Sequence, residues 1–252
     1  MKTGICKLCL QKKELCKESH IIPDFHYKFL YGKNKELVYV NNKKVERRYN
    51  GEYEGNILCE DCDGKIIGRL EDYASKLLHN KFSSETIFRI EQIDGKEHVI
   101  LENAPNYNYS YFKLFLLSIL WRASISTRPF FRSLKLNNEK EEDLRLMILN
   151  SDAGDPREYS CLILLPPLVQ IPDGGRGFIT RHMQTMSPEY IKKDDTEICK
   201  FVIEGVHYFF IISAPETWCI NPSVERNRLT IGFTSIQDQE NILREIISIF
   251  RK

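Results

Sequence analysis

The spacing of apolar residues along the chain predicts a helix in the segment 59–78. Apolar side chains recur there every three or four positions, which is the period of an amphipathic helix. They are Ile66, Ile67, Leu70, Ala74, Leu77 and Leu78. Glu60, Asp61 and Asp63 make the first turn acidic, as is typical of a helix N-terminus.

Strand and helix patterns alternate in the rest of the chain. Segments 35–49 and 86–104 are each expected to form a hairpin, the second with Asp-Gly at its turn. A long apolar helix is expected near 109–126. A second helix is expected in 137–150, where polar residues can cap its start. From Tyr159 onward short strands dominate, in segments 159–165, 198–204, 206–212 and 229–233. Residues 236–250 have the pattern of a closing amphipathic helix.

This order of elements predicts an α+β protein with two domains. We expect an N-terminal zinc-binding module in residues 1–82, held by a knuckle at one end and a helix at the other. We expect a mixed helical domain with an antiparallel sheet in residues 83–252.

Composition and charge narrow the class of protein. Hydrophobic residues make up 42% of the 252 and charged residues 28%, as in ordinary globular proteins. The net charge is only +1, so any nucleic-acid contact must come from a local basic patch. No apolar run reaches the roughly 20 residues of a membrane-spanning helix, and the first residues lack the apolar core of a signal peptide. We therefore expect a cytoplasmic protein without a membrane partner.

Four of the eight cysteines form two C-x2-C pairs, Cys6/Cys9 and Cys59/Cys62. Each pair can supply two thiolates from one tight turn, and two such turns complete a tetrahedral zinc site. A closed shell of four sulfurs leaves no position for water, so the zinc would be structural. We interpret Cys16 as a small core residue.

The cysteine pairs, the sequence Ser-His-Ile-Ile-Pro at 19–23 and the helix after the second pair together resemble the zinc-bearing HNH endonucleases. The resemblance covers residues 6 to about 78 and implies a treble-clef fold. It implies that His20 is the general base that activates water, that Asp63 binds a catalytic divalent cation such as Mg²⁺, and that Asn56 braces the loop. It also implies a bacterial or mobile-element nuclease.

This chain departs from the family pattern at several of these positions. Ser19 stands where the family usually has an Asp or His ligand, and Asp63 stands where it usually has His or Asn. The family's Asn usually lies about two positions before Asn56, near the position of Glu54. Residues that could replace the missing ligand are Glu18, Asp24, His26 and Glu71. Because Glu71 is about 12 Å along the helix from Asp63, we expect it to pack rather than to share the ion.

Basic residues mark two further segments. Lys43, Lys44, Arg47 and Arg48 can contact phosphates, or can belong to a solvated hairpin. Arg122 lies within the apolar helix, where a guanidinium needs a partner. We expect a buried ion pair with an acidic residue of the zinc module; the alternative is an anion or nucleotide pocket near Arg128 and Arg132.

The sequence thus predicts a metal-dependent HNH-like nuclease that hydrolyses phosphodiester bonds in DNA or possibly RNA, with residues 83–252 recognising a substrate, a partner or a trigger. In the alternative prediction His20 is a structural imidazole, and the module is an inactive zinc-stabilised treble clef that binds nucleic acid or a protein.

Overall fold

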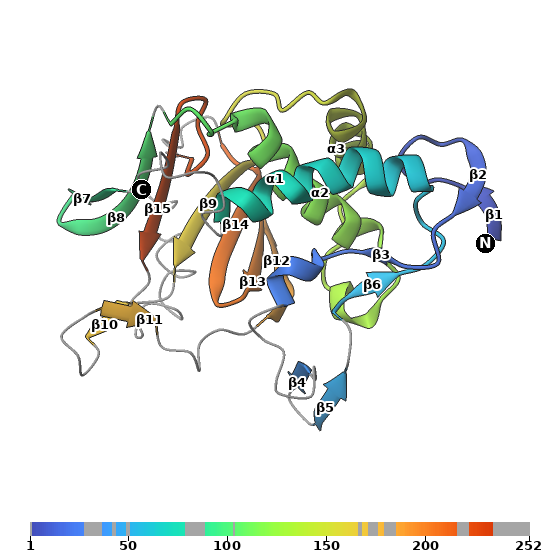
Figure 1. Cartoon of the computed structure of the whole chain (residues 1–252), viewed down its shortest axis with the longest axis horizontal. Coiled ribbons are helices and arrows are strands. Elements are labelled where there is room, and N and C mark those ends of the chain that lie inside the picture. The colour runs from blue at the N-terminus through green and yellow to red at the C-terminus, as the bar shows by residue number, and fades with distance from the viewer. Residues whose placement is uncertain are drawn as a thin grey trace. The chain divides into compact units, whose positions relative to one another are not determined.

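A computed structural model of the chain describes residues 2–27, 37–41, 44–48, 51–78, 89–102, 104–165, 168–170, 176–178, 185–215 and 222–233. Its contacts divide the chain into two compact units. Figure 1 labels the helices and strands named below. Unit 1 consists of Met1–Ser84 and Asn108–Asp155, and unit 2 of Glu85–Tyr107 and Pro156–Lys252. We expected two consecutive domains with a boundary at residue 82. Each of these units instead combines two separate segments of the chain.

Unit 1 contains short strands and most of the helices. Its strands are β1 (Lys2–Ile5), β2 (Lys12–Leu15), β3 (Ser19–His20), β4 (Leu37–Asn41), β5 (Lys44–Arg48) and β6 (Tyr53–Glu54). Its helical segments are η1 (Asp24–Tyr27), η2 (Asp61–Ile67), α1 (Gly68–Leu78), α2 (Tyr109–Ile125), η3 (Pro129–Phe131) and α3 (Asn138–Asn150). The strand pairs are β1–β2, β3–β6 and β4–β5, all antiparallel.

Helix α2 is the core of unit 1. Its side chains are buried all round, as expected of a helix with apolar residues on every face, and it packs against both α1 and α3. Ile21 and Ile22 are fully buried, and in the following turn Phe25 stacks on Phe115 of α2 at 5.9 Å between ring centroids. The apolar residues after His20 therefore join the core that anchors strand β3.

The predicted helices of unit 1 are confirmed, with one local difference. Asn108 and Asn137 cap α2 and α3, accepting bonds from Tyr111 N at 3.0 Å and Lys140 N at 2.9 Å. The helix after the second cysteine pair begins as the π-helical segment η2, in which Gly68 N–H donates to Asp63 O, five residues back. Such wide turns are frequent at functional sites.

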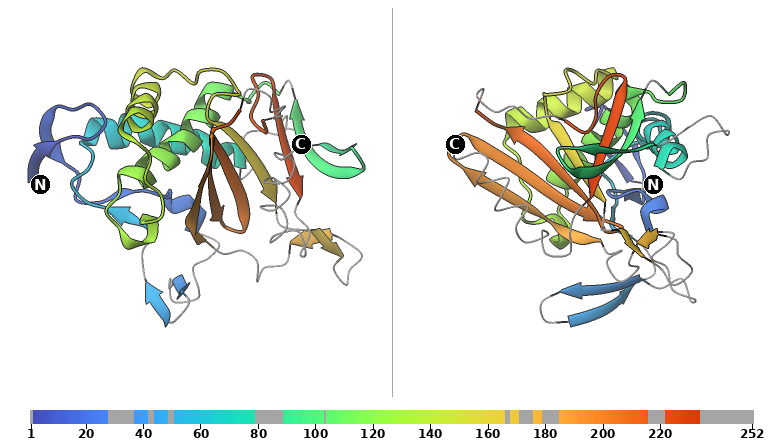
Figure 2. Two further views of the ribbon diagram at one scale, coloured as in Figure 1. Left: turned by 180° about the vertical axis from the view of Figure 1, so that it is seen from behind. Right: turned by 90° about the vertical axis from the view of Figure 1, so that its left-hand side faces the viewer.

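Unit 2 is built on a seven-stranded sheet in the order β12-β13-β14-β9-β15-β8-β7. Figure 2 shows its long strands side by side from two directions. The strands are β7 (Arg89–Ile93), β8 (Lys96–Glu102), β9 (Ser160–Leu165), β12 (Met186–Lys193), β13 (Thr196–Ile203), β14 (Val206–Ser213) and β15 (Arg228–Phe233). β10 (Leu168–Gln170) and β11 (Arg176–Phe178) form a separate hairpin.

The expected sheet is present, but it is mixed rather than antiparallel throughout. Strand β15 pairs antiparallel with β8 and parallel with β9. It lies between two neighbours that run in opposite directions, so one of its pairs must be parallel. The predicted hairpin β7–β8 is confirmed, with positive φ at Asp94 and Gly95 as its tight turn requires. The predicted helix at 236–250 lies outside the described residues.

Candidate metal centre and active site

Cys6 and Cys9 lie in the tight turn between β1 and β2. Leu10 N–H donates to Cys6 O at 2.9 Å, and Cys6 N–H donates to Gln11 O at 2.9 Å, which closes the turn. Leu10 has φ of 58°, a left-handed conformation that a leucine adopts only when its surroundings impose it. The backbone of this turn is thus held in a fixed shape around the two thiols.

Cys59 and Cys62 lie where the chain enters η2. Lys7 N–H donates to Ile57 O and Cys16 N–H to Leu58 O, both at 2.8 Å. These bonds join the segment before Cys59 to the β1–β2 hairpin and its next residue, so two regions far apart in sequence face each other.

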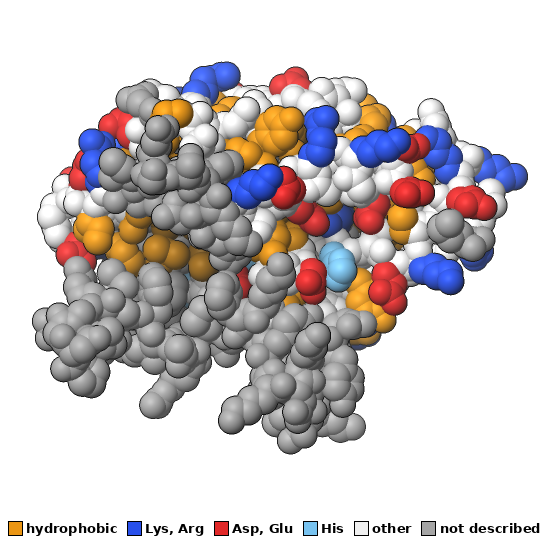
Figure 3. Space-filling model, in the orientation of Figure 1, with side chains coloured by type: hydrophobic (Ala, Val, Ile, Leu, Met, Phe, Trp, Pro, Cys, Tyr) orange, Lys and Arg blue, Asp and Glu red, His pale blue; other side chains and the backbone are white. Residues whose placement is uncertain are grey.

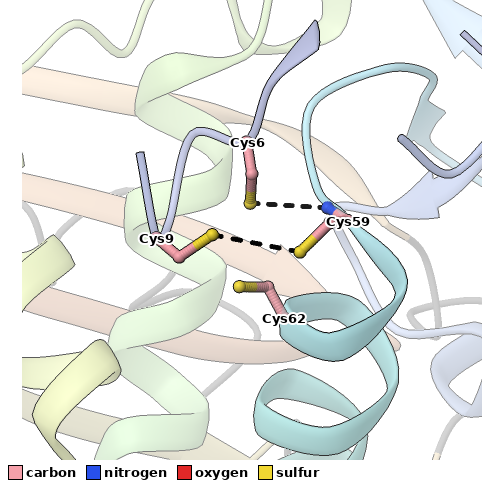
Figure 4. Close-up of side chains that lie close together, drawn as sticks. All are labelled: Cys6, Cys9, Cys59 and Cys62. Carbon is pink, nitrogen blue, oxygen red and sulfur yellow. Dashed lines mark hydrogen bonds between the residues drawn. The ribbon is translucent and has the colours of Figure 1, made fainter. Parts of the chain in front are cut away.

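The four cysteine side chains point toward a common centre (Figure 4). All their Sγ atoms lie within 4.8 Å of one another, and Cys9 Sγ is 4.0 Å from Cys59 Sγ. Sulfur atoms bound to one zinc ion at about 2.3 Å would lie roughly 3.8 Å apart. The predicted ligand set is therefore brought together, and it can bind a metal ion such as zinc.

The thiols differ in how readily they lose a proton. Burial raises the pKa of the Cys6 thiol, but backbone N–H groups of Cys9, Cys59 and Leu8 outweigh this effect and lower its pKa to about 7. Burial raises the pKa values of Cys59 and Cys62. A cation would favour the thiolate form of all four residues, so binding releases protons. Cys16 stands outside the cluster.

Strand β3 carries Ser19 and His20, which pair with Glu54 and Tyr53 of β6. Directly paired residues share one face of a ladder, so His20 lies beside Tyr53, with ring centroids 6.5 Å apart. His20 is partly exposed, whereas Ser19 is fully buried. On the face shown in Figure 3 a histidine side chain reaches the surface with acidic side chains on either side.

Asp63 of η2 lies near this strand. Burial raises the pKa of its carboxyl group; the Ser19 hydroxyl and the charges of Arg122 and His20 act in the opposite direction, and Glu71 adds to the increase. The Ser19 oxygen is nevertheless buried without a fully formed hydrogen bond in the described part of the chain. The Ser19 hydroxyl and the charge of His20 thus lie close enough to Asp63 to act on its carboxyl group.

Arg122 confirms the predicted buried ion pair. Its side chain is 1% exposed, and Nη1 lies 2.7 Å from Glu71 Oε1 of helix α1. The guanidinium also donates to the carbonyl oxygens of His20 and, at 3.1 Å, Ser118. Arg122 therefore fixes the backbone of His20 to helix α2, and Glu71 is engaged as a counterion.

For the other predicted site residues the structure gives a position but no contact that indicates a role. Asn56 is exposed, with φ of 62°, and its N–H donates to Cys16 O at 2.9 Å; its role as a brace stays a prediction. Lys43 lies outside the described residues, and the side chains of Lys44, Arg47 and Arg48 on β5 are also outside them. Among the candidate replacement ligands, Glu18 and Asp24 are exposed and His26 is buried.

Glu54 anchors strand β6, a role that the sequence does not predict. Its carboxylate accepts hydrogen bonds from Ser126 Oγ at 2.6 Å and from Thr127 N and Oγ1 at 2.9 and 2.6 Å. It thereby ties β6, opposite Ser19, to the segment after α2. Only its place near the family's Asn position drew attention to it, because its partners are more than 70 positions away in sequence.

Over the described ranges, the four cysteines are the one group of three or more His, Cys, Asp and Glu side chains that could hold a metal ion. Among the helices that the structure describes, none is both long and apolar enough to cross a membrane. No family model, curated protein or solved structure matches the chain.

Proposed function

We propose that the chain is a metal-dependent, HNH-like nuclease that hydrolyses phosphodiester bonds in DNA or RNA. The observation that supports it best is the meeting of Ser19, His20 and Asp63 beside the cysteine cluster. They come from a strand pair and from the start of a helix, which is the arrangement that the resemblance implies.

In this proposal the cysteine cluster holds a structural zinc ion in a treble-clef module. The ion would fix the first hairpin to the start of η2, since two ligands come from each. Cys62 directly precedes Asp63, so the same ion would fix the position of the proposed catalytic carboxylate.

His20 is the proposed general base. A neutral imidazole can accept a proton from water. Its partial exposure allows water to reach the ring, and the Arg122 bond to its carbonyl oxygen holds the backbone still. Arg122 thus positions His20 through its backbone, not through the imidazole.

Asp63 and Ser19 would hold the catalytic divalent cation through oxygen atoms. Mg²⁺ in proteins is commonly held by one or two carboxylates together with substrate phosphate and water, and Asp63 would supply one such carboxylate. When bound, such a cation neutralises charge on the phosphate and the leaving oxygen. The basic residues Lys43, Lys44, Arg47 and Arg48 would contact the nucleic-acid backbone.

The second candidate function is a zinc-stabilised module that binds nucleic acid or a protein without cleaving it. The full burial of Ser19, where the family usually has a ligand, favours this reading. Both candidates can be separated by one assay.

The test is cleavage of labelled DNA and RNA by the full-length protein with and without Mg²⁺ or Mn²⁺. His20→Ala keeps the carbonyl that Arg122 binds, so we expect normal zinc content and thermal stability but a rate at least ~100-fold lower. His98→Ala is the matched control, because His98 lies on β8 in unit 2 and should leave the rate unchanged. Equal rates for wild type and His20→Ala would contradict the mechanism, and binding without cleavage by either would favour the second candidate.

A further inference from the structure

The segment that follows helix α2 is held against strand β6. Glu54 accepts the hydrogen bonds of Ser126 and Thr127 described above, and Arg128 N–H donates to Ser126 Oγ at 3.1 Å. The backbone of Arg128 is thus tied to the strand that pairs with Ser19 and His20.

The Arg128 guanidinium lies against Tyr53 and near Glu52. Its central carbon lies 5.9 Å from the centroid of the Tyr53 ring, a distance that permits a cation–π contact. Its Nε is 3.7 Å from Glu52 Oε2, too far for a hydrogen bond, and has no hydrogen-bond partner among the described residues. The side chain as a whole is 41% exposed, although Nε itself is buried.

Arg128 and His20 both lie against Tyr53. His20 and Tyr53 are directly paired across β3 and β6, and their rings meet edge to face. The proposed base and a partly exposed cation therefore both lie against the same aromatic ring.

We propose that Arg128 binds a phosphate group of the nucleic-acid substrate next to the phosphodiester bond that is attacked by the water activated by His20. This inference rests on the proposed function, because it takes a nucleic-acid strand as the substrate. A guanidinium presents parallel N–H donors that match two oxygens of one phosphate, and stacking on a ring keeps that plane fixed.

A purely structural role for Arg128 as the counterion of Glu52 makes a different prediction. Glu52 is 1% exposed, and its carboxylate is the one anion paired with Arg128 in the described part of the chain. In that case Arg128→Lys would preserve function, because it keeps the positive charge. If Arg128 binds phosphate through its fork, the lysine variant keeps stability but loses part of the affinity.

The experiment measures binding of a fluorescein-labelled DNA or RNA oligonucleotide to the zinc-loaded full-length chain by fluorescence anisotropy. All variants carry His20→Ala to prevent cleavage, and each is measured at several salt concentrations. We expect Arg128→Ala to weaken binding about 10-fold and to reduce the slope of log affinity against log salt by about one. Arg128→Lys should be intermediate.

Arg132→Ala is the matched control, because Arg132 is exposed four residues further on. It should bind like the parent protein. Equal affinities for Arg128→Ala and the parent, equal losses for Arg128→Ala and Arg132→Ala, or full affinity in Arg128→Lys would overturn the assignment while leaving the nuclease intact. Absence of both binding and cleavage in the wild type would overturn the assignment and the proposed function together.

Discussion

His207 on strand β14 is a buried histidine in a mostly apolar position. It is 4% exposed, and its Nδ1 has no hydrogen-bond partner in the part of the chain that the structure describes. Burial lowers its pKa from 6.5 to about 4, and the nearby charge of Lys200 adds to the decrease. The folded protein therefore holds this ring neutral at pH values where an unfolded chain would protonate it.

This shift predicts how the stability of unit 2 depends on pH. The contribution of His207 is fully present above pH 6.5, where the ring is neutral in both states, and is lost as the pH falls toward about 4. The loss can reach roughly 3 kcal/mol, since each pKa unit corresponds to about 1.4 kcal/mol. Urea unfolding followed between pH 7 and 4 measures it.

The variant that isolates this effect is His207→Phe, which cannot take up the proton. Its stability should decline less than that of the wild type over the same pH range. If the difference in unfolding free energy between the two proteins stays constant from pH 7 to pH 4, His207 is not the group responsible.

The contacts of some residues could be predicted from the sequence, and those of others could not. The zinc-type spacing of Cys6, Cys9, Cys59 and Cys62 is a local signal, because a C-x2-C turn dictates which atoms can share an ion. The partners of Glu54 carry no such signal, since they depend on how α2 ends in space.

At the scale of elements, a buried ion pair connects helices α1 and α2. Arg122 is 1% exposed and Glu71 is 23% exposed, so the pair is shielded far better than a surface pair. Sequence reasoning predicted that Arg122 would need an acid from the zinc module. It could not select Glu71, because the choice depends on how the two helices cross.

Removing one partner of this pair should be costly. Arg122→Met is expected to lower the free energy of unfolding by about 3–5 kcal/mol, because it leaves Glu71 without its cation and frees the His20 carbonyl. Chemical denaturation of single and double variants measures this.

The double variant Arg122→Met, Glu71→Leu should recover part of the loss, since no charge is then stranded. Lys76→Ala on the same helix is the control, because the exposed Lys76–Asp72 pair is worth well under about 1 kcal/mol. Strictly additive losses in the double variant would show that Arg122 and Glu71 do not stabilise each other.

Local elements were largely predictable, whereas the order of strands was not. Asp94-Gly95 specifies a tight hairpin turn, and the polar caps Asn108 and Asn137 specify helix starts. The position of β15 between β8 and β9 is set by packing across the whole sheet. A single strand sequence therefore cannot reveal that one of its pairs is parallel.

At the scale of the whole molecule, the two units are not consecutive in sequence. Unit 1 uses Asn108–Asp155, which supplies α2 and α3, while the hairpin β7–β8 belongs to unit 2. Arg145 of α3 donates to Leu8 O in the turn that carries Cys6 and Cys9, at 2.6 Å, so this turn contacts a helix that follows it by more than 100 residues. A boundary placed by pattern changes along the chain does not reveal such an exchange.

The proposed nuclease depends on one metal ion, which would join the β1–β2 hairpin to the start of η2 and so hold His20 and Asp63 together. The most direct test is the metal content of the folded, full-length protein, measured by mass spectrometry of the metal with thiol titration. We predict one zinc per chain with four protected thiols, lost in Cys59→Ser and retained in Cys16→Ser. A folded wild-type protein without zinc and with all four thiols reactive would contradict the account.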